Sequence, residues 1–189
     1  MSGGLQTVDD AVAMIHAIIN TDKESQSWST YAMQGTGLCV THVERDGVVA
    51  GSGRRAAEER PARAKKCTVR FRFQVTPPMS NMFGTMHGGC VATMIDILSS
   101  FVLALQTPGE TGTPWSTFGV SQTLSVNYLA PTRLDSWVEV ESTTLQAGRM
   151  IALLNTDMYE LTGKDGDRVK MTATSGHYKI DTSSRSAKM

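Results

Sequence analysis

A single charged residue, Asp96, stands in the middle of an otherwise apolar segment, NMFGTMHGGCVATMIDILSSFVLAL, that runs from Asn81 to Leu105. A carboxylate in such surroundings is costly unless another group pairs with it or a reaction uses it. A positioned carboxylate can act as a general base or as a nucleophile. Asp96 is therefore the first candidate catalytic residue, although a structural carboxylate bonded to a neighbouring backbone turn would give the same pattern.

The start of this segment offers hydrogen-bond donors. Gly88 and Gly89 are predicted to open a helix, whose first N–H groups lack intrahelical partners and whose dipole favours negative charge. Because glycine has no side chain, a substrate carbonyl can approach these N–H groups closely. We expect His87 to orient the loop through a hydrogen bond rather than to act as a base.

Asp96 follows His87 by nine residues, and this spacing limits how the two can cooperate. On one regular helix their side chains lie on opposite faces, about 13 Å apart along the axis. A two-fold dimer removes the difficulty, because the helix start of one subunit can face the aspartate of the other. The spacing thus predicts a homo-oligomer with sites between subunits.

The elements that position these groups follow from the hydrophobic pattern. An amphipathic helix is predicted over Val8 to Ile19, and a long buried helix around Asp96. A helix that is apolar on nearly all sides must be wrapped, so we expect an α+β fold in which an antiparallel sheet of five to six strands curls round it. Alternating residues between turn signals predict the strands: Leu38–Val43, Thr68–Val75, Val120–Leu129, Trp137–Leu145, Met150–Glu160 and Arg168–Ile180.

We expect three parts along the chain: an N-terminal helical extension over residues 1–34, one domain over residues 35–182, and a C-terminal tail over residues 183–189. Within the domain, the stretch from Asp46 to Lys66 is rich in glycine, small residues and charges. This composition predicts a mobile surface insertion or a short charged helix. Its basic residues would either meet phosphates or simply be solvated.

Composition excludes several classes of function. Lys plus Arg and Asp plus Glu each number 18, so no bulk attraction to nucleic acid or an anionic membrane is expected. Three cysteines without CxxC spacing argue against a disulfide scaffold or a zinc site. The apolar run of about 16 residues is short of the roughly 20 that span a bilayer. There is also no G-x-S-x-G motif of a serine hydrolase.

The compartment is predicted from the two ends of the chain. The N-terminus lacks the pattern of a secretory signal, which favours the cytoplasm. The last residues, Ala187-Lys188-Met189, are similar to relaxed forms of the peroxisomal S-K-L address, which gives a peroxisomal location as the alternative.

The pattern N-x-x-G-T-x-H-G-G, followed by an apolar helix with Asp96, resembles the hotdog-fold acyl-CoA thioesterases. The most similar branch contains phenylacetate-pathway thioesterases, thioesterase superfamily member 2 and one type of 4-hydroxybenzoyl-CoA thioesterase. GVSQTLSVNYLAPTRL, QAGRMIALLNTDMY and SGHYKI resemble later strands of that branch. The resemblance covers about Gly35 to Asp181 and omits the insertion.

The resemblance implies hydrolysis of an acyl-CoA at a dimer interface, without a further cofactor because coenzyme A is part of the substrate. It places the Gly88 N–H and the Asn81 amide at the thioester carbonyl oxygen. It makes Asp96 the group that activates water or attacks directly, with Ser121 helping to hold the water. His177 would assist near the thioester or the leaving sulfur, or be a surface histidine of its strand.

The same resemblance implies that basic residues on turns meet the phosphates of coenzyme A. Arg133 and Arg149 are the candidates, because guanidinium groups pair with phosphate oxygens, although solvated turns are the alternative. Two other functions stay open: release of an acyl or polyketide chain from a carrier protein, and a catalytically silent binding module. A hotdog hydratase is disfavoured because no D-x-x-x-x-H occurs.

Overall fold

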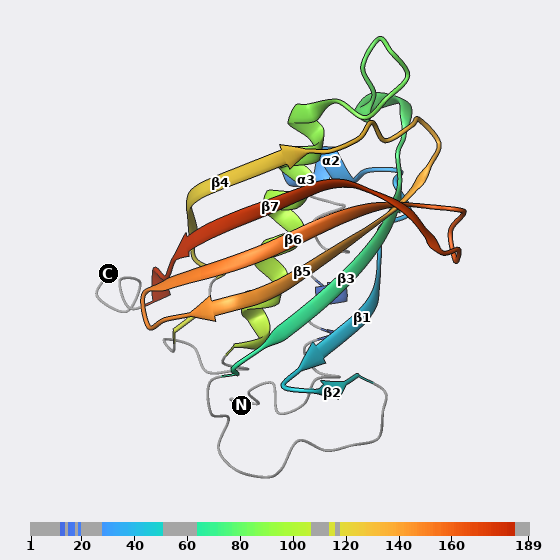
Figure 1. Cartoon of the computed structure of the whole chain (residues 1–189). Helices are drawn as coiled ribbons and strands as arrows, with labels where there is room; N and C mark the ends of the chain where they lie inside the picture. Colours follow the sequence, from blue (N-terminus) through green and yellow to red (C-terminus); the bar gives the residue numbers. More distant parts are fainter. Residues whose placement is uncertain are drawn as a thin grey trace.

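The computed structural model describes residues 12–13, 15–17, 19, 28–50, 64–106, 114–115 and 118–183. One antiparallel sheet dominates it and curls round the helix α3, Gly88–Ser100, which lies behind the sheet in Figure 1. The strands in the order β2-β1-β3-β5-β6-β7-β4 are Val48–Val49, Cys39–Arg45, Cys67–Gln74, Trp137–Ala147, Ile151–Leu161, Arg168–Ile180 and Val120–Tyr128. The predicted α+β fold, a sheet wrapped round one central helix, is confirmed.

All six predicted strands are present, with ends within a few residues of those expected. The sheet also contains β2, a two-residue strand that pairs with β1 through Glu44 and Arg45. Strand β2 lies at the start of the predicted insertion. The glycine and valines around this turn did not predict a strand. Residues 51–63 of that insertion lie outside the described residues, so its predicted mobility stays a prediction.

The core lies between the sheet and α3. Strand β3 turns Val69, Phe71 and Phe73 inward, and these and Val75, just after the strand, are fully buried, as their alternation predicted. Phe71 packs against Phe101, just past the end of α3, with ring centroids 5.6 Å apart, and Met94 of α3 is buried in the same core. At roughly 2 kcal/mol per buried large apolar side chain, this contact stabilises the position of the helix strongly.

Helix α3 continues into a 3-10 helix, η2, at Phe101–Leu105. Together they form an 18-residue helical segment of mean hydropathy 1.8, long and apolar enough to cross a membrane by length and composition. The buried core helix of a soluble protein passes the same test, and 56% of this segment is buried inside the protein. Its position inside the sheet identifies it as the core helix.

The N-terminal region contributes further helices. The described residues between 12 and 19 are helical, and Ile15 and Ile19 are buried in the core, in keeping with the predicted amphipathic helix. A short helix, α2 (Trp28–Met33), lies within the expected N-terminal extension. The 3-10 helix η1 (Pro77–Met79) ends the segment after β3. The division at residues 34 and 182 stays a prediction.

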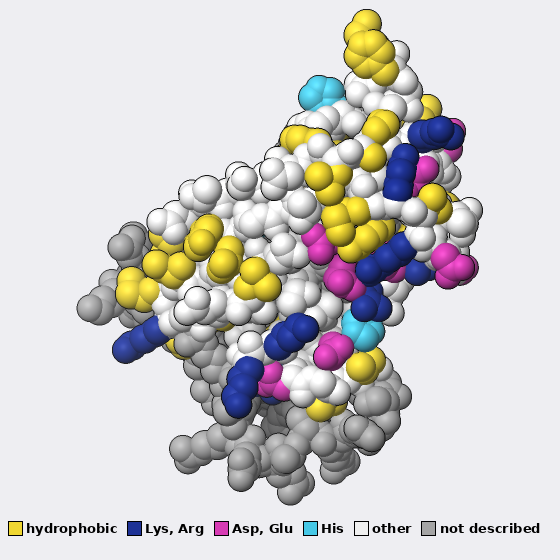
Figure 2. All heavy atoms as spheres, viewed as in Figure 1, with side chains coloured by type: hydrophobic (Ala, Val, Ile, Leu, Met, Phe, Trp, Pro, Cys, Tyr) yellow, Lys and Arg dark blue, Asp and Glu magenta, His cyan; other side chains and the backbone are white. Residues whose placement is uncertain are grey.

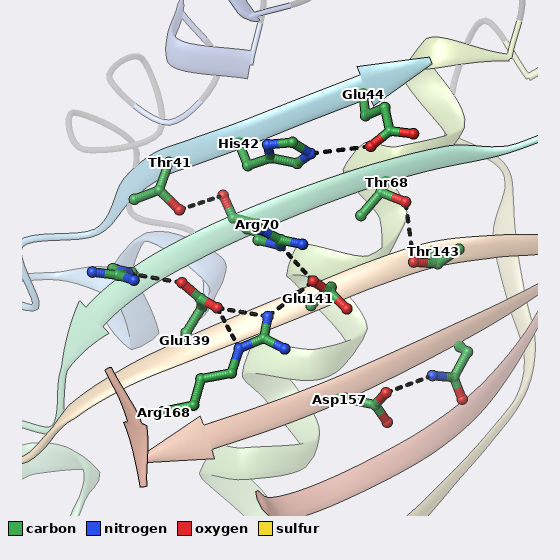
Figure 3. A network of polar contacts seen from close by, with 12 residues as sticks. Thr41, His42, Glu44, Thr68, Arg70, Glu139, Glu141, Thr143, Asp157 and Arg168 are labelled. Atoms are coloured by element: carbon green, nitrogen blue, oxygen red, sulfur yellow. Dashed lines mark hydrogen bonds and ion pairs between the residues drawn. The ribbon is translucent and has the colours of Figure 1, made fainter. Parts of the chain in front are cut away.

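The outer face of the sheet carries a network of charges, shown in Figure 3. Glu139, only 5% exposed, accepts from Arg72 at 2.8 Å and from Arg168 at 2.6 Å. Glu141 is shared between Arg168, at 2.9 Å, and Arg70. These groups satisfy one another on the face opposite α3, so the network stabilises the sheet and is separate from the Asp96 region. Figure 2 shows it as alternating blue and magenta patches.

Candidate active site

Asp96 lies on the face of α3 that the sheet leaves partly uncovered. Its side chain is 46% exposed, and Gly89, Thr93 and Ser100 share this face at helical spacing. The Ser121 hydroxyl, at the start of edge strand β4, donates a hydrogen bond of 2.8 Å to Asp96 Oδ1. The carboxylate therefore lies between the helix and the sheet edge, held by a neighbouring strand and open to solvent.

His177 lies directly behind Ser121 on β7 and is fully buried. Its Nε2 is 3.0 Å from Ser121 Oγ and 3.4 Å from Asp96 Oδ1. Its Nδ1 is 2.7 Å from the hydroxyl oxygen of Ser99 on α3. The surface alternative for His177 is therefore wrong: the side chain bridges helix and strand inside the protein.

The electrostatics around His177 favour a neutral ring. Burial, followed by the positive charge of Lys179, lowers the pKa of His177 from 6.5 to about 4, against an opposing effect of Asp96. A neutral, fully buried imidazole cannot readily deliver a proton to a thiolate outside the protein. The predicted role beside the thioester or the leaving sulfur stays a prediction, and the observed contact places the ring behind Ser121.

Lys179 brings a positive charge to the same region. It lies two residues after His177 on the inner side of β7, is 5% exposed, and donates to Ser100 Oγ at 2.7 Å. Burial lowers the pKa of Lys179, while the charge of Asp96 acts in the opposite direction. The negative charge of Asp96 on α3 and the positive charge of Lys179 on β7 thus compensate each other.

Within the part of the chain that the structure describes, the start of α3 presents one unused backbone donor. His87 is the N-cap, and its Nδ1 accepts from the Gly89 N–H at 2.9 Å. The N–H groups of Met86, His87, Cys90 and Val91 donate to backbone carbonyls. The Gly88 N–H has no acceptor among the residues that the structure describes. A donor aimed outward at a helix N-terminus is suited to bind a developing negative charge.

Tyr128, at the far end of β4, covers this helix start. Its hydroxyl donates to the Gly88 carbonyl at 3.0 Å, and its ring lies 3.5 Å from the place where a Gly88 Cβ would be. Beside the pair is a mostly apolar pocket of about 340 Å³, which Met86, Val91 and Leu129 help to line. The free N–H of Gly88 therefore opens beside a space that an apolar group can occupy.

Asn81 holds the loop that precedes the helix. Its Oδ1 accepts from the Phe83 N–H at 2.9 Å, and its Nδ2 donates to Thr85 Oγ1 at 3.0 Å. The second amide hydrogen has no acceptor in the described part of the chain. At the tip of the loop, the green loop at the top of Figure 1, Met82 and Phe83 are 91% and 82% exposed. In this chain Asn81 mainly shapes the loop.

The two candidate phosphate-binding arginines lie far apart. Arg133 is exposed and is bridged to Thr85, next to the helix start. Arg149 is exposed in the turn between β5 and β6, beside the end of β7. Within one chain they therefore belong to opposite ends of the sheet, one near Gly88 and the other near Ser121.

Asp96 and Gly88 are separated in the same way. Eight residues of α3 place them about 12 Å apart along the helix axis. Gly88 lies at the Tyr128 end of β4 and Asp96 at the Ser121 end. One chain therefore carries two half-sites, a carboxylate with a bonded serine and a helix start with a free donor.

Sequence reasoning missed three residues of these half-sites. Ser99 and Tyr128 carried no recognised motif, because their partners are 78 and 40 residues away in the chain. Lys179 could have been found, since the period of two that places His177 on the inner face of β7 places Lys179 there as well. In the described part of the chain, no group of three His, Cys, Asp or Glu side chains is arranged to hold a metal ion.

Comparisons with known proteins also find a resemblance to thioesterases. Residues 83–173 match the family described as Thioesterase superfamily. Acyl-coenzyme A thioesterase 13 of Homo sapiens is 31% identical over 93 residues, 49% of this chain, and the match covers only 61% of that relative; the Pongo abelii protein gives the same values.

Solved structures share the fold. The zebra fish thioesterase superfamily member 2 has a TM-score of 0.63 at 18% identity, covering 89% of this chain and 96% of the other. A thioesterase protein of Streptococcus pneumoniae, solved with coenzyme A, has a TM-score of 0.50 at 22% identity, covering 61% and 79%. The predicted resemblance to the hotdog-fold thioesterases is confirmed.

Proposed function

We propose that this hotdog-fold protein, whose residues 83–173 match the thioesterase superfamily, hydrolyses the thioester of an acyl-CoA at a site shared by two subunits. Asp96 of one subunit activates a water molecule, and the Gly88 N–H of the other polarises the thioester carbonyl. The single observation that carries the proposal is that, among the described residues, the Gly88 N–H has no acceptor while the neighbouring donors of the helix start are used. A donor at an oxyanion is typically worth about 3 kcal/mol.

The edge strand β4 supports the two-subunit arrangement. It is the last strand of the sheet, and every residue in it except Leu124 and Val126 is exposed. A long exposed edge is a template for pairing with another strand. Antiparallel pairing of two β4 strands about a two-fold axis near their middle would place Ser121 of one subunit opposite Tyr128 of the other. Each Asp96 half-site would then meet a Gly88 half-site.

The chemistry balances within this site. Asp96 takes a proton from water while the oxygen attacks the thioester carbon, and the Gly88 N–H binds the oxyanion. Collapse of the tetrahedral intermediate breaks the C–S bond, and the proton held by Asp96 passes to the thiolate of coenzyme A. Direct attack by Asp96, giving a mixed anhydride that water then cleaves, is the alternative. A single turnover in heavy-oxygen water separates the two, because only the anhydride route puts label into the enzyme carboxylate.

Two features favour an acyl-CoA as substrate. The apolar pocket beside Gly88 and Tyr128 suits an acyl group. The two-fold pairing that joins the half-sites would also bring Arg133 of one subunit to the same end as Arg149 of the other. Two guanidinium groups at one mouth suit the phosphates of coenzyme A. The Streptococcus pneumoniae structure with coenzyme A supports the same substrate class.

The remaining site residues have supporting roles in the proposal. His87 caps α3 and so fixes the direction of the Gly88 N–H. Gly89 has no side chain beside the capping ring of His87, where a Cβ would come within 3.2 Å of Nδ1, and so lets ring and substrate share the helix start. The second amide hydrogen of Asn81 can turn toward the carbonyl oxygen as the substrate binds. The cytoplasm is proposed as the compartment, with the peroxisome as the alternative; residues 187–189 lie outside the described residues.

Free-thiol release from a panel of acyl-CoAs tests the proposal. Turnover of at least one acyl-CoA, lowered at least about a hundredfold in Asp96→Asn, is the expected result. A flat panel with an intact dimer would favour a silent binding module. Turnover of acyl-carrier protein alone would favour release of a chain from a carrier.

A further inference from the structure

The polar groups behind Asp96 form a continuous chain of hydrogen bonds that ends at its carboxylate. It runs from Ser99 Oγ to His177 Nδ1 at 2.7 Å, from His177 Nε2 to Ser121 Oγ at 3.0 Å, and from Ser121 Oγ to Asp96 Oδ1 at 2.8 Å. Ser99 and His177 are fully buried, so water cannot replace either partner. Each proton in the chain must therefore be assigned to one of its members.

Counting protons leaves two arrangements. A neutral imidazole carries one N–H, and each serine carries one O–H. In the first arrangement, Ser99 donates to Nδ1, Nε2–H donates to Ser121, and Ser121 donates to Asp96. In the second, Ser99 donates to the Asp96 carbonyl at 3.2 Å, Nδ1–H donates to Ser99, and Ser121 turns to Nε2. Asp96 then loses its donor.

The geometry favours the first arrangement. The contact of Ser99 with Nδ1 is shorter than its contact with the Asp96 carbonyl, 2.7 Å against 3.2 Å. In the second arrangement the lone pair of Nε2 also faces Asp96 Oδ1 at 3.4 Å. A lone pair that faces a carboxylate oxygen is repelled by it. Hydrogen bonds to an ionised acceptor are about twice as strong as neutral ones, so the arrangement that gives Asp96 a donor is preferred.

We propose that Ser99 is a positioning residue for Asp96. Its hydroxyl keeps Nδ1 of His177 an acceptor, so that the Nε2 proton and then the Ser121 proton both point toward the carboxylate. Asp96 Oδ1 is thereby held, and Oδ2 stays free for the attacking water. The catalytic part of this inference rests on the proposed thioester hydrolysis, whereas the direction of the chain does not.

A long-range proton–nitrogen NMR spectrum of the nitrogen-labelled protein tests the direction of the chain. The His177 signals, assigned by their loss in His177→Gln, are expected to show a protonated Nε2 and an unprotonated, hydrogen-bonded Nδ1. In Ser99→Ala the Nδ1 signal should move to that of a nitrogen without a hydrogen bond. Ser142→Ala, which removes another fully buried hydroxyl, bonded to Thr156 at 3.0 Å, is the matched control and should leave the His177 signals in place.

Kinetics test the positioning role. Ser99→Ala should lower kcat about tenfold with KM unchanged, the scale of one hydrogen bond to a charged group, while Ser142→Ala should keep kcat. A protonated Nδ1 in the unmodified protein, or equal kcat in the two variants, would overturn the inference. If the protein hydrolyses no acyl-CoA, the proposed function fails, and the spectrum alone decides the direction of the chain.

Discussion

The hydroxyl of Ser121 donates to Asp96 Oδ1 at 2.8 Å, joining residues 25 positions apart in the chain. This bond explains how a carboxylate persists in an apolar helix: it faces the sheet edge, where one strand holds it and solvent reaches it. It also divides the site. The groups that hold Asp96 all lie at one end of β4, and the free donor of Gly88 lies at the other.

The Gly88 N–H can be deleted with little disturbance. Proline is well tolerated at the first position of a helix, and the preceding His87 has an extended backbone, φ −65° and ψ 135°, that a following proline accepts. Gly88→Pro should therefore lower kcat about a hundredfold while leaving the fold intact. Gly88→Ala keeps the N–H and meets Tyr128 only at ordinary contact distance, so it is the control. Equal kcat in the two variants would remove this N–H from the mechanism.

Arg133 and Arg149 are expected to bind the phosphates of coenzyme A. Arg133→Gln and Arg149→Gln should each raise KM for an acyl-CoA about tenfold, since each loses a charge-assisted hydrogen bond. The KM for the same acyl group on a short thiol without phosphates should not change. Steady-state kinetics on the two substrates check this, and equal effects on both would count against phosphate binding.

The folded protein should become less stable as the pH is lowered, because of His177. Above pH 6.5 the imidazole is neutral in both folded and unfolded chains. As the pH falls from 6.5 toward the folded pKa of about 4, the unfolded chain binds a proton that the folded chain does not. The free energy of unfolding should therefore decrease, by about 3 kcal/mol at the lower limit.

Urea unfolding at fixed protein concentration measures this decrease, and His177→Gln should remove most of it between pH 6.5 and 5. Glu141 affects the free energy of unfolding only at lower pH. Burial would raise the pKa of Glu141, but hydrogen bonds from Arg168 and Arg70 outweigh burial and hold the pKa below 4.5. Its stabilisation is present above that value and is lost as the pH falls below it. An unchanged slope in His177→Gln would contradict the buried, neutral histidine.

Lys179 should control the pKa of His177. Its positive charge disfavours protonation of the ring, so Lys179→Met should raise the pKa of His177 above about 4, toward 6.5. Lys170→Met is the control, because Lys170 lies on the same strand but pairs with Glu160 at 3.2 Å. An NMR titration of the imidazole protons measures both variants, and equal pKa values would rule out the proposed coupling.

The sequence was informative where one residue could be interpreted from its neighbours. Alternation in β3 gave its inner face, and the lone charge of Asp96 gave the candidate carboxylate. Partners that meet through folding were harder: Ser99 looks like an ordinary helix residue until β7 brings His177 onto it. The burial of His177 likewise depends on how closely α3 packs against β7, which the pattern of one strand does not contain.

Each site is proposed to join Asp96 of one subunit to Gly88 of another, and co-expression of two inactive chains tests this arrangement most directly. Asp96→Asn and Gly88→Pro homodimers should both be nearly inactive. In a mixed dimer one site keeps both intact groups, so random pairing should restore about a quarter of the unmodified activity. If the mixture stays as inactive as the two homodimers, although mixed dimers have formed, the shared site is contradicted.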